Sequence, residues 1–152
     1  MPDLRKTCKN TIQTLLKNFP CIAILGARQV GKTTILKQTL PNAPFFDLEK
    51  ANDFERIQSD PDFFLSQYQD TPIAIDEAQT LPKLFPALRV AIDSKRSLNG
   101  QYLISASSSP ELITQIRETL AERIAVFELN GFTIEEAFGL STNKFVKVHL
   151  AA

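Results

Sequence analysis

The stretch Gly26-Ala27-Arg28-Gln29-Val30-Gly31-Lys32-Thr33-Thr34 follows a short apolar run, Cys21-Ile22-Ala23-Ile24-Leu25. An apolar run of this length, rich in β-branched residues and stopped by a glycine, is typical of a strand buried on both faces. Residues 32–40 then show a helical pattern that ends before Pro41. A strand, a glycine loop and a helix in this order are the first half of a βαβ unit, and they predict a parallel sheet covered by helices.

The same alternation of short apolar runs and helical patterns continues along the chain. We predict further strands at residues 44–49, 73–76, 101–105 and 124–129. Helices are expected at residues 4–18, 51–58, 61–69, 82–98 and 110–120, with a last helical turn at 133–138. Strands that alternate with helices in this way favour right-handed βαβ crossovers. The expected fold class is therefore α/β, a three-layer αβα arrangement around a mostly parallel five-stranded sheet.

Composition excludes several other classes of protein. The chain has 152 residues, with 17 Lys and Arg against 17 Asp and Glu, so the formal net charge is zero. This balance argues against a dedicated nucleic-acid-binding protein, which usually carries a basic surface, and against a disordered chain. A single histidine, His149, and two cysteines without a CxxC motif give no support for a histidine-rich metal site, a catalytic triad or a disulfide framework. With no apolar stretch near the roughly 20 residues of a membrane span, we expect a cytoplasmic protein.

The glycine loop matches the pattern G-x-x-x-x-G-K-[ST] at every fixed position, in the strand–loop–helix context that the pattern requires. Its glycines allow consecutive backbone N–H groups to point at one phosphate, and the start of the following helix adds a partial positive charge. Lys32 can reach the β- and γ-phosphates as a compact cation, and the Thr33 hydroxyl can bind Mg²⁺. We expect the crown residues Arg28 and Gln29 to be solvated. The expected nucleotide-binding residues are Gly26, Val30, Gly31, Lys32, Thr33 and Thr34.

An acidic pair, Asp76-Glu77, ends the predicted strand at 73–76. In this place Asp76 is expected to hold Mg²⁺, which usually keeps several of its waters. Glu77 is expected to orient and polarise the water that attacks the γ-phosphate. The alternative is an acidic turn without a catalytic role. Gln79 either lines the same site or is an exposed turn residue.

Two further positions are candidates for contact with the γ-phosphate. The strand at 101–105 becomes polar at its carboxyl end, where Ser105 or Ser107 could sense the phosphate or the water; alternatively, the serines at 107–109 start the next helix. Arg123, just before the last predicted strand, could stabilise transition-state charge in its own chain or in a neighbouring subunit. The alternative for Arg123 is a surface ion pair with an acid such as Glu122.

Five segments in this order resemble a known family: GARQVGKTT (26–34), FFDLE (45–49), IAIDEAQTLPKLFPALR (73–89), LISASSSPEL (103–112) and LAERIAVFEL (120–129). They look like the AAA-type P-loop ATPase domain of prokaryotic proteins that often carry a C-terminal DUF4143 domain (AAA_14-like). The resemblance implies a RecA/AAA-like fold with an additional strand between the two Walker strands. It also implies ATP and Mg²⁺ as ligands, Ser105 or Ser107 as sensor, and Arg123 as the charge-stabilising arginine.

The sequence departs from the family pattern at two of these segments. The usual Thr-Gly-Ser at the fourth strand reads Ser105-Ala106-Ser107, which leaves the sensor open between the two serines. The usual Leu-Ala-Gly-Arg reads Leu120-Ala121-Glu122-Arg123, so a glutamate stands beside the arginine.

Family members usually continue beyond the ATPase core. We therefore expect a core at residues 1–140 and a tail at 141–152, the start of a C-terminal region that a truncated or short family member lacks. The expected function is Mg²⁺-dependent ATP hydrolysis by a motor or switch domain, with a homo-oligomer and a protein or DNA client as expected partners. The alternatives are a nucleotide-binding module without significant hydrolysis and, with less support, a small-molecule kinase.

Overall fold

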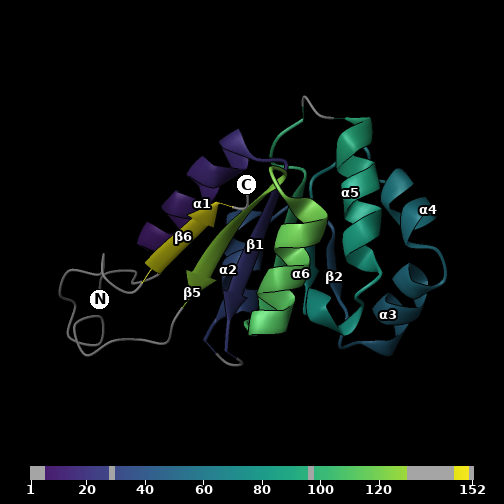
Figure 1. Ribbon diagram of the computed structural model, residues 1–152, viewed down its shortest axis with the longest axis horizontal. Coiled ribbons are helices and arrows are strands. Elements are labelled where there is room, and N and C mark those ends of the chain that lie inside the picture. The colour runs from purple at the N-terminus through teal and green to yellow at the C-terminus, as the bar shows by residue number, and fades with distance from the viewer. Residues whose placement is uncertain (1–5, 28–29, 96–97, 130–145, 151–152) are drawn as a thin grey trace.

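A six-stranded sheet runs through the middle of the computed structural model, which describes residues 6–27, 30–95, 98–129 and 146–150 (Figure 1). The strands are β1 (Cys21–Gly26), β2 (Phe45–Asp47), β3 (Ile73–Asp76), β4 (Tyr102–Ser107), β5 (Ile124–Leu129) and β6 (Val146–Leu150). They lie in the order β2-β3-β4-β1-β5-β6, and the first five are parallel. The predicted parallel α/β sheet is confirmed. Strand β4 is the additional strand, between β1 and β3.

The sixth strand is a difference from the sequence-based expectation. Residues 146–150, which we expected in a tail, pair antiparallel with β5 at the edge of the sheet. The sequence Val-Lys-Val-His-Leu alternates apolar and polar residues, which is the pattern of an edge strand rather than of a buried parallel one. The helical turn expected at 133–138 lies outside the described residues.

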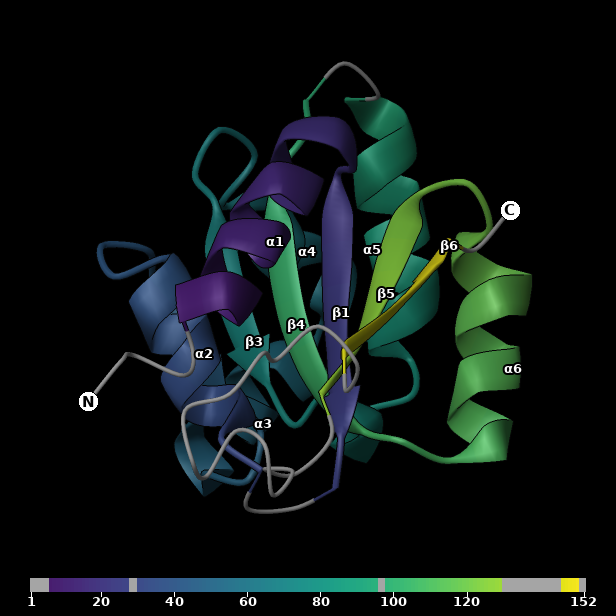
Figure 2. The ribbon, with the colours of Figure 1, turned by 90° about the vertical axis from the view of Figure 1, so that its left-hand side faces the viewer.

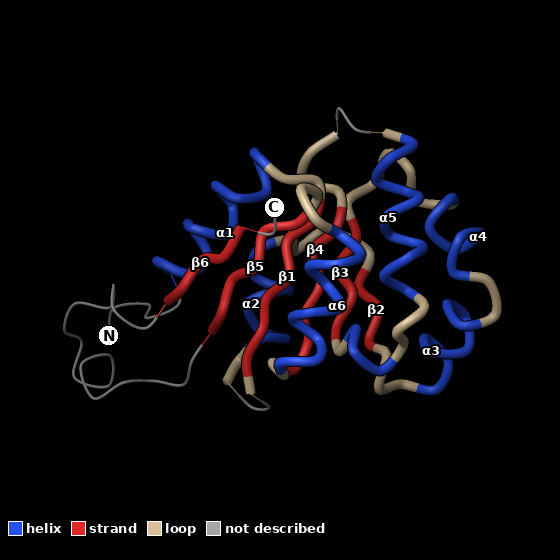
Figure 3. Tube along the Cα trace, viewed as in Figure 1, coloured by secondary structure: helices blue, strands red, loops and turns tan. Residues whose placement is uncertain are grey.

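The described part of the chain has seven helical segments, of which α1 precedes the first strand and the others connect the strands (Figure 3). They are α1 (Lys6–Asn18), α2 (Lys32–Thr39), α3 (Ala51–Gln58), α4 (Pro61–Ser66), the 3-10 turn η1 (Ala78–Thr80), α5 (Leu84–Ser94) and α6 (Pro110–Leu120). Each predicted helix up to residue 120 is present. The helix expected at 82–98 is shorter at both ends. Among the described residues, none of the helices combines the length and the apolar character that crossing a bilayer requires.

Helices cover both faces of the sheet, and each face has its own hydrophobic core (Figure 2). Alternate residues of β1 point to opposite faces, as they do in any strand. Cys21, Ala23 and Leu25 join the core under α3–α6, whereas Ile22 and Ile24 join the core under α1 and α2. All five side chains are buried, which confirms the predicted strand covered on both faces, and burial raises the pKa of the Cys21 thiol.

Parallel pairing brings the carboxyl ends of β1, β4 and β3 together along one side of the sheet, which we call its carboxyl edge. Gly26 at the end of β1 is level with Ser107 at the end of β4, while Asp76 ends β3 on the far side of β4. Ligands of open α/β sheets bind at this edge. Three of the polar segments predicted from the sequence therefore lie together there.

Candidate functional site

The glycine loop folds around the ammonium group of Lys32. Gly31 caps α2 with a left-handed backbone (φ 96°), and Lys32 is the first residue of that helix. The Lys32 Nζ donates hydrogen bonds to the carbonyl oxygens of Gly26 (2.5 Å) and Ala27 (3.2 Å). Only 4% of Lys32 is exposed. A buried cation is costly unless it is paired or hydrogen-bonded, so this ammonium is held in place at the mouth of the loop.

Gly26 is required at the start of the loop by close packing. A Cβ at this position would lie 2.4 Å from the carbonyl oxygen of Leu129 and 2.9 Å from Val30 Cγ2. Both distances are shorter than any normal van der Waals contact. The backbone of the loop therefore passes β5 at a distance that a side chain at position 26 would not allow, which explains the first glycine of the motif.

The carboxylate of Asp76 joins α2 to β3 and β4. The Thr33 hydroxyl donates to Asp76 Oδ2 at 2.6 Å, and the Ser105 hydroxyl donates to Asp76 Oδ1. Asp76 is 3% exposed and Ser105 is completely buried, so both are satisfied by these contacts rather than by solvent. The predicted metal ligands Thr33 and Asp76 are thus in direct contact, although 43 residues separate them in the sequence.

This pair of oxygen donors fits Mg²⁺. The ion prefers carboxylate, hydroxyl and water oxygens, and in phosphate-binding sites it is usually held by one or two protein side chains together with phosphates and waters. Within the described residues, no cluster of three or more His, Cys, Asp or Glu side chains forms a closed metal site. A hydroxyl and a carboxylate beside a phosphate loop can hold Mg²⁺ only together with a phosphate, which is the arrangement that a nucleotide site needs.

Glu77 follows Asp76 in a left-handed backbone conformation (φ 59°, ψ 45°), which turns the chain sharply at the end of β3. Its backbone N–H donates to the Ser105 hydroxyl at 3.0 Å. Its carboxylate Oε2 accepts a hydrogen bond of 2.5 Å from Gln79 Nε2. A non-glycine residue in this conformation is uncommon and is often found where function constrains the backbone. The structure therefore brings the two acids of the predicted pair to the same edge of the sheet as Lys32.

The two alternatives for Gln79 are decided by its contacts. Gln79 is half-buried, and its Oε1 accepts from the backbone N–H of Ser107 at 3.3 Å. It therefore lines the site and is not an exposed turn residue. The sequence could not predict that the Gln79 amide bonds both Glu77 and Ser107. The one signal in the sequence was its position two residues after Glu77.

The serines at the end of β4 have different places. Ser105 contacts Asp76 and the backbone of Glu77, and it is fully buried. Ser107 ends the strand level with Gly26, whereas Ser109 is the N-cap of α6 and accepts from the N–H of Leu112 at 3.2 Å. The helix-start alternative thus holds for Ser109. Ser105 and Ser107 both lie at the site.

Arg123 is not brought to this site. It precedes β5 at the opposite edge of the sheet, because Ile124 pairs with Cys21 at the amino end of β1. Its Nε and Nη2 donate to the two carboxylate oxygens of Asp93 at 2.7 and 3.1 Å. This hydrogen-bonded pair raises the pKa of the guanidinium. The six residues of β1, at about 3.3 Å each, separate it from Gly26. The structure therefore does not bring Arg123 to the predicted site of its own chain, and it forms an ion pair in which Asp93 is the acid.

We expect Arg123→Ala to change stability and not catalysis within one chain. The pair with Asp93 is bidentate but partly exposed, so its loss should lower the free energy of unfolding by about 1 kcal/mol. Nucleotide turnover should stay within about twofold of wild type, measured beside urea unfolding. A loss of turnover near the roughly 10³-fold or more that an arginine finger supplies, with unchanged stability, would instead show that Arg123 serves a neighbouring subunit.

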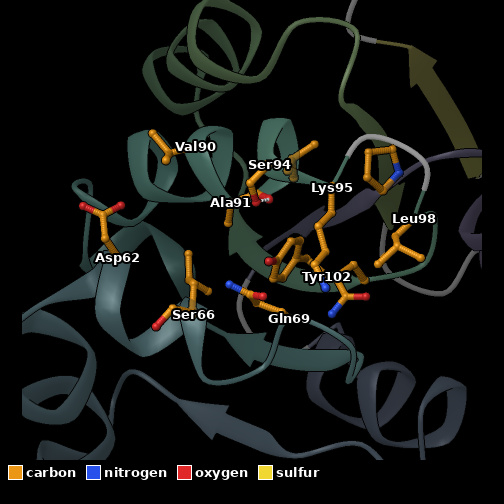
Figure 4. Close-up of a pocket in the computed structure, with 13 residues that line it drawn as sticks. Asp62, Ser66, Gln69, Val90, Ala91, Ser94, Lys95, Leu98 and Tyr102 are labelled. Atoms are coloured by element: carbon orange, nitrogen blue, oxygen red, sulfur yellow. Dashed lines mark hydrogen bonds between the residues drawn. The ribbon is translucent and has the colours of Figure 1, made fainter.

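A cavity of about 220 Å³ also lies away from the predicted site. Figure 4 shows it between α4 and α5, with Val90 and Asp62 at one end and Leu98 and Tyr102 at the other. Burial raises the pKa of the Tyr102 hydroxyl to about 12, so this group stays protonated at neutral pH. None of the predicted site residues lines the cavity. The residues of the site at the carboxyl edge are joined by hydrogen bonds and do not line this cavity.

The parallel sheet and the glycine loop at this edge are those of a P-loop domain. The AAA_14 family model, described as "AAA domain", matches residues 18–138, and the chain belongs to that family. The predicted family is thus confirmed. No comparison shows a DUF4143 domain or a truncation for this chain.

Two curated relatives are uncharacterized proteins, Rv2008c of Mycobacterium tuberculosis and Mb2031c of Mycobacterium bovis. Each is 37% identical over 134 residues, which cover 87% of this chain. The matched part spans only 30% of the length of either relative.

Two solved structures share the fold. A DNA replication initiation factor has a TM-score of 0.56 at 14% identity, and the match covers 95% of this chain and 54% of that one. A Walker-type ATPase of Pyrococcus abyssi has a TM-score of 0.60 at 17% identity, with 91% and 59% covered. At these identities the likeness establishes the fold alone.

Proposed function

We propose that this chain binds ATP with Mg²⁺ at the carboxyl edge of the sheet, hydrolyses it to ADP and phosphate, and acts as a motor or switch domain. The observation that carries the proposal is the hydrogen bond between Thr33 of the phosphate loop and Asp76 of β3. This bond supports the proposal because it joins a hydroxyl and a carboxylate, oxygen donors that Mg²⁺ prefers, and Thr33 follows Lys32 directly in the sequence. The neighbouring Glu77 adds a carboxylate that can act as a base.

The loop residues bind the phosphates. The backbone N–H groups of the loop and the start of α2 favour an anion, with Gly26, Val30, Gly31 and Thr34 shaping the cradle. Lys32 exchanges its hydrogen bonds to loop carbonyls for phosphate oxygens, which are stronger acceptors because they are charged. Thr33 and Asp76 would hold Mg²⁺, and the bound ion would supply positive charge that stabilises the γ-phosphoryl group.

Glu77 serves the attacking water. In hydrolysis the water oxygen forms a bond to the γ-phosphorus, the bond to the β-phosphate oxygen breaks, and a proton of the water passes to the Glu77 carboxylate. Ser105 holds the backbone of Glu77 and the carboxylate of Asp76 with one hydroxyl, so the two acids keep a fixed spacing. Sensing of the γ-phosphate is proposed for Ser105 or Ser107.

Phosphate release and ATP binding together test this proposal. We expect the wild-type chain to release phosphate from ATP with Mg²⁺ and to lose this activity in EDTA, because Thr33 and Asp76 then have no ion to hold. Calorimetric titration with ATP measures binding independently. Binding without phosphate release would favour the alternative, a nucleotide-binding module, and a chain that neither binds nor hydrolyses ATP would overturn the proposal.

The partners are proposed on the resemblance, and the location is proposed on the hydropathy and cysteine usage of the sequence. We propose a cytoplasmic protein that works on a protein or DNA client and can form a homo-oligomer.

A further inference from the structure

We propose that Gln79 is a positioning residue that holds the Glu77 carboxylate in place for catalysis. The inference rests on the ATP hydrolysis proposed above and adds a residue to it. The side-chain amide of Gln79 makes two hydrogen bonds, one from Nε2 to Glu77 Oε2 (2.5 Å) and one at Oε1 from the N–H of Ser107 (3.3 Å). It therefore joins the proposed catalytic carboxylate to the end of β4.

The backbone of Glu77 is fixed without Gln79. The Ser105 hydroxyl accepts its N–H, and its carbonyl oxygen accepts from both the hydroxyl (2.9 Å) and the N–H (3.1 Å) of Thr80. These contacts end at the backbone. Among the described residues, Gln79 supplies the one hydrogen bond to the Glu77 carboxylate. A glutamate side chain has three rotatable bonds, so without this contact the carboxylate is free to leave the site even while the turn stays intact.

The other end of the amide reaches the end of β4, the strand that pairs with β1, and the phosphate loop follows β1. Ser107 is level with Gly26 in the sheet, and the carbonyl oxygen of Gly26 accepts from both Lys32 Nζ and the N–H of Ser108. Gln79 therefore fixes the carboxylate relative to the lysine that is to bind the phosphates. An amide suits this place because it carries a donor and an acceptor on one group, which neither a carboxylate nor a thioether provides.

The position of the carboxylate matters because a general base must lie within hydrogen-bond reach of the proton that it accepts. A misplacement of about 1 Å can cost roughly 100-fold in rate. The two hydrogen bonds of the Gln79 amide go to Glu77 and to the backbone of Ser107. Its loss is therefore expected to affect the chemical step and to leave nucleotide binding in place.

Two variants and a control test this role. Gln79→Met keeps the length of the side chain and removes both hydrogen bonds. It should lower kcat roughly 10- to 100-fold, with KM and calorimetric ATP affinity within about twofold of wild type. Gln79→Glu replaces the hydrogen-bond donor by a second carboxylate that repels the Glu77 carboxylate, so it should lower kcat at least as far as Gln79→Met does. Gln13→Met makes the same chemical change at an exposed position of α1 and should behave as wild type.

The outcomes separate the two proposals. If the wild-type chain releases no phosphate, the proposed hydrolysis fails and the role of Gln79 fails with it. If wild type is active and Gln79→Met keeps its kcat, only the role of Gln79 is overturned. A fall in kcat accompanied by an equal loss of ATP affinity and of thermal stability would indicate a structural residue and would also overturn it. A Gln79→Glu protein that keeps the kcat of wild type counts against contact between residue 79 and the Glu77 carboxylate.

Discussion

Glu77→Gln is expected to lower ATP hydrolysis by roughly 10²- to 10⁴-fold and to leave ATP binding intact. The amide has nearly the shape of the carboxylate, and its oxygen can still accept the hydrogen bond from Gln79. It cannot accept the proton of the attacking water. Because the backbone of Glu77 is held by Ser105 and Thr80, the turn at the end of β3 should not change. The variant therefore removes one chemical property of the site and little else.

The measurement is phosphate release beside calorimetric titration with ATP and Mg²⁺. Glu118→Gln makes the same chemical change at an exposed position of α6 and serves as the matched control. It should hydrolyse ATP at the wild-type rate. A Glu77→Gln protein that still hydrolyses ATP within about tenfold of wild type would show that another group accepts the proton, since loss of a general base normally costs more than this.

The fold could be predicted from the sequence because its signals are local. An apolar run such as Cys21–Gly26 has no polar face that could meet solvent, so it is typical of a strand that is covered on both sides. The positions of Gly and Pro then predicted where most helices begin and end. The strand at 146–150 was not predicted. Its alternating pattern is typical of an edge strand, and the pattern alone does not show that this strand pairs with β5.

The sequence predicted only those parts of the candidate site that belong to a motif whose residues have a known spatial arrangement. The loop around Lys32 and the acids after β3 follow from the rule that ligands lie at the carboxyl ends of parallel strands. The same rule places Arg123 away from the site. It stands before its strand, and a residue before a parallel strand lies at the opposite edge. The contacts of Gln79 could not be predicted, because a side chain in a turn has no periodicity that fixes its direction.

Lys32→Met is expected to weaken ATP binding by roughly 10- to 100-fold and to lower hydrolysis further. One charge-assisted hydrogen bond is lost from the bound nucleotide, at about 1.5–3 kcal/mol. The remaining loss falls on the transition state, where the removal of a single donor costs roughly 10²- to 10³-fold. The side chain is buried, so the apolar stem of methionine fills the same space. The carbonyl oxygen of Gly26 keeps a weaker contact from the N–H of Ser108 at 3.4 Å, and the fold should therefore persist.

Lys37→Met is the matched control for this variant, because Lys37 lies on the same helix with its Nζ 4.8 Å from the centre of the Phe45 ring. It is exposed, and it should bind and hydrolyse ATP as wild type does. Lys32→Arg keeps the charge but replaces a compact ammonium by a broad planar group, which does not fit between the carbonyls of Gly26 and Ala27. We expect it to be impaired as well. Full activity in Lys32→Met, measured by phosphate release and by ATP titration, would mean that the phosphates bind elsewhere than this loop.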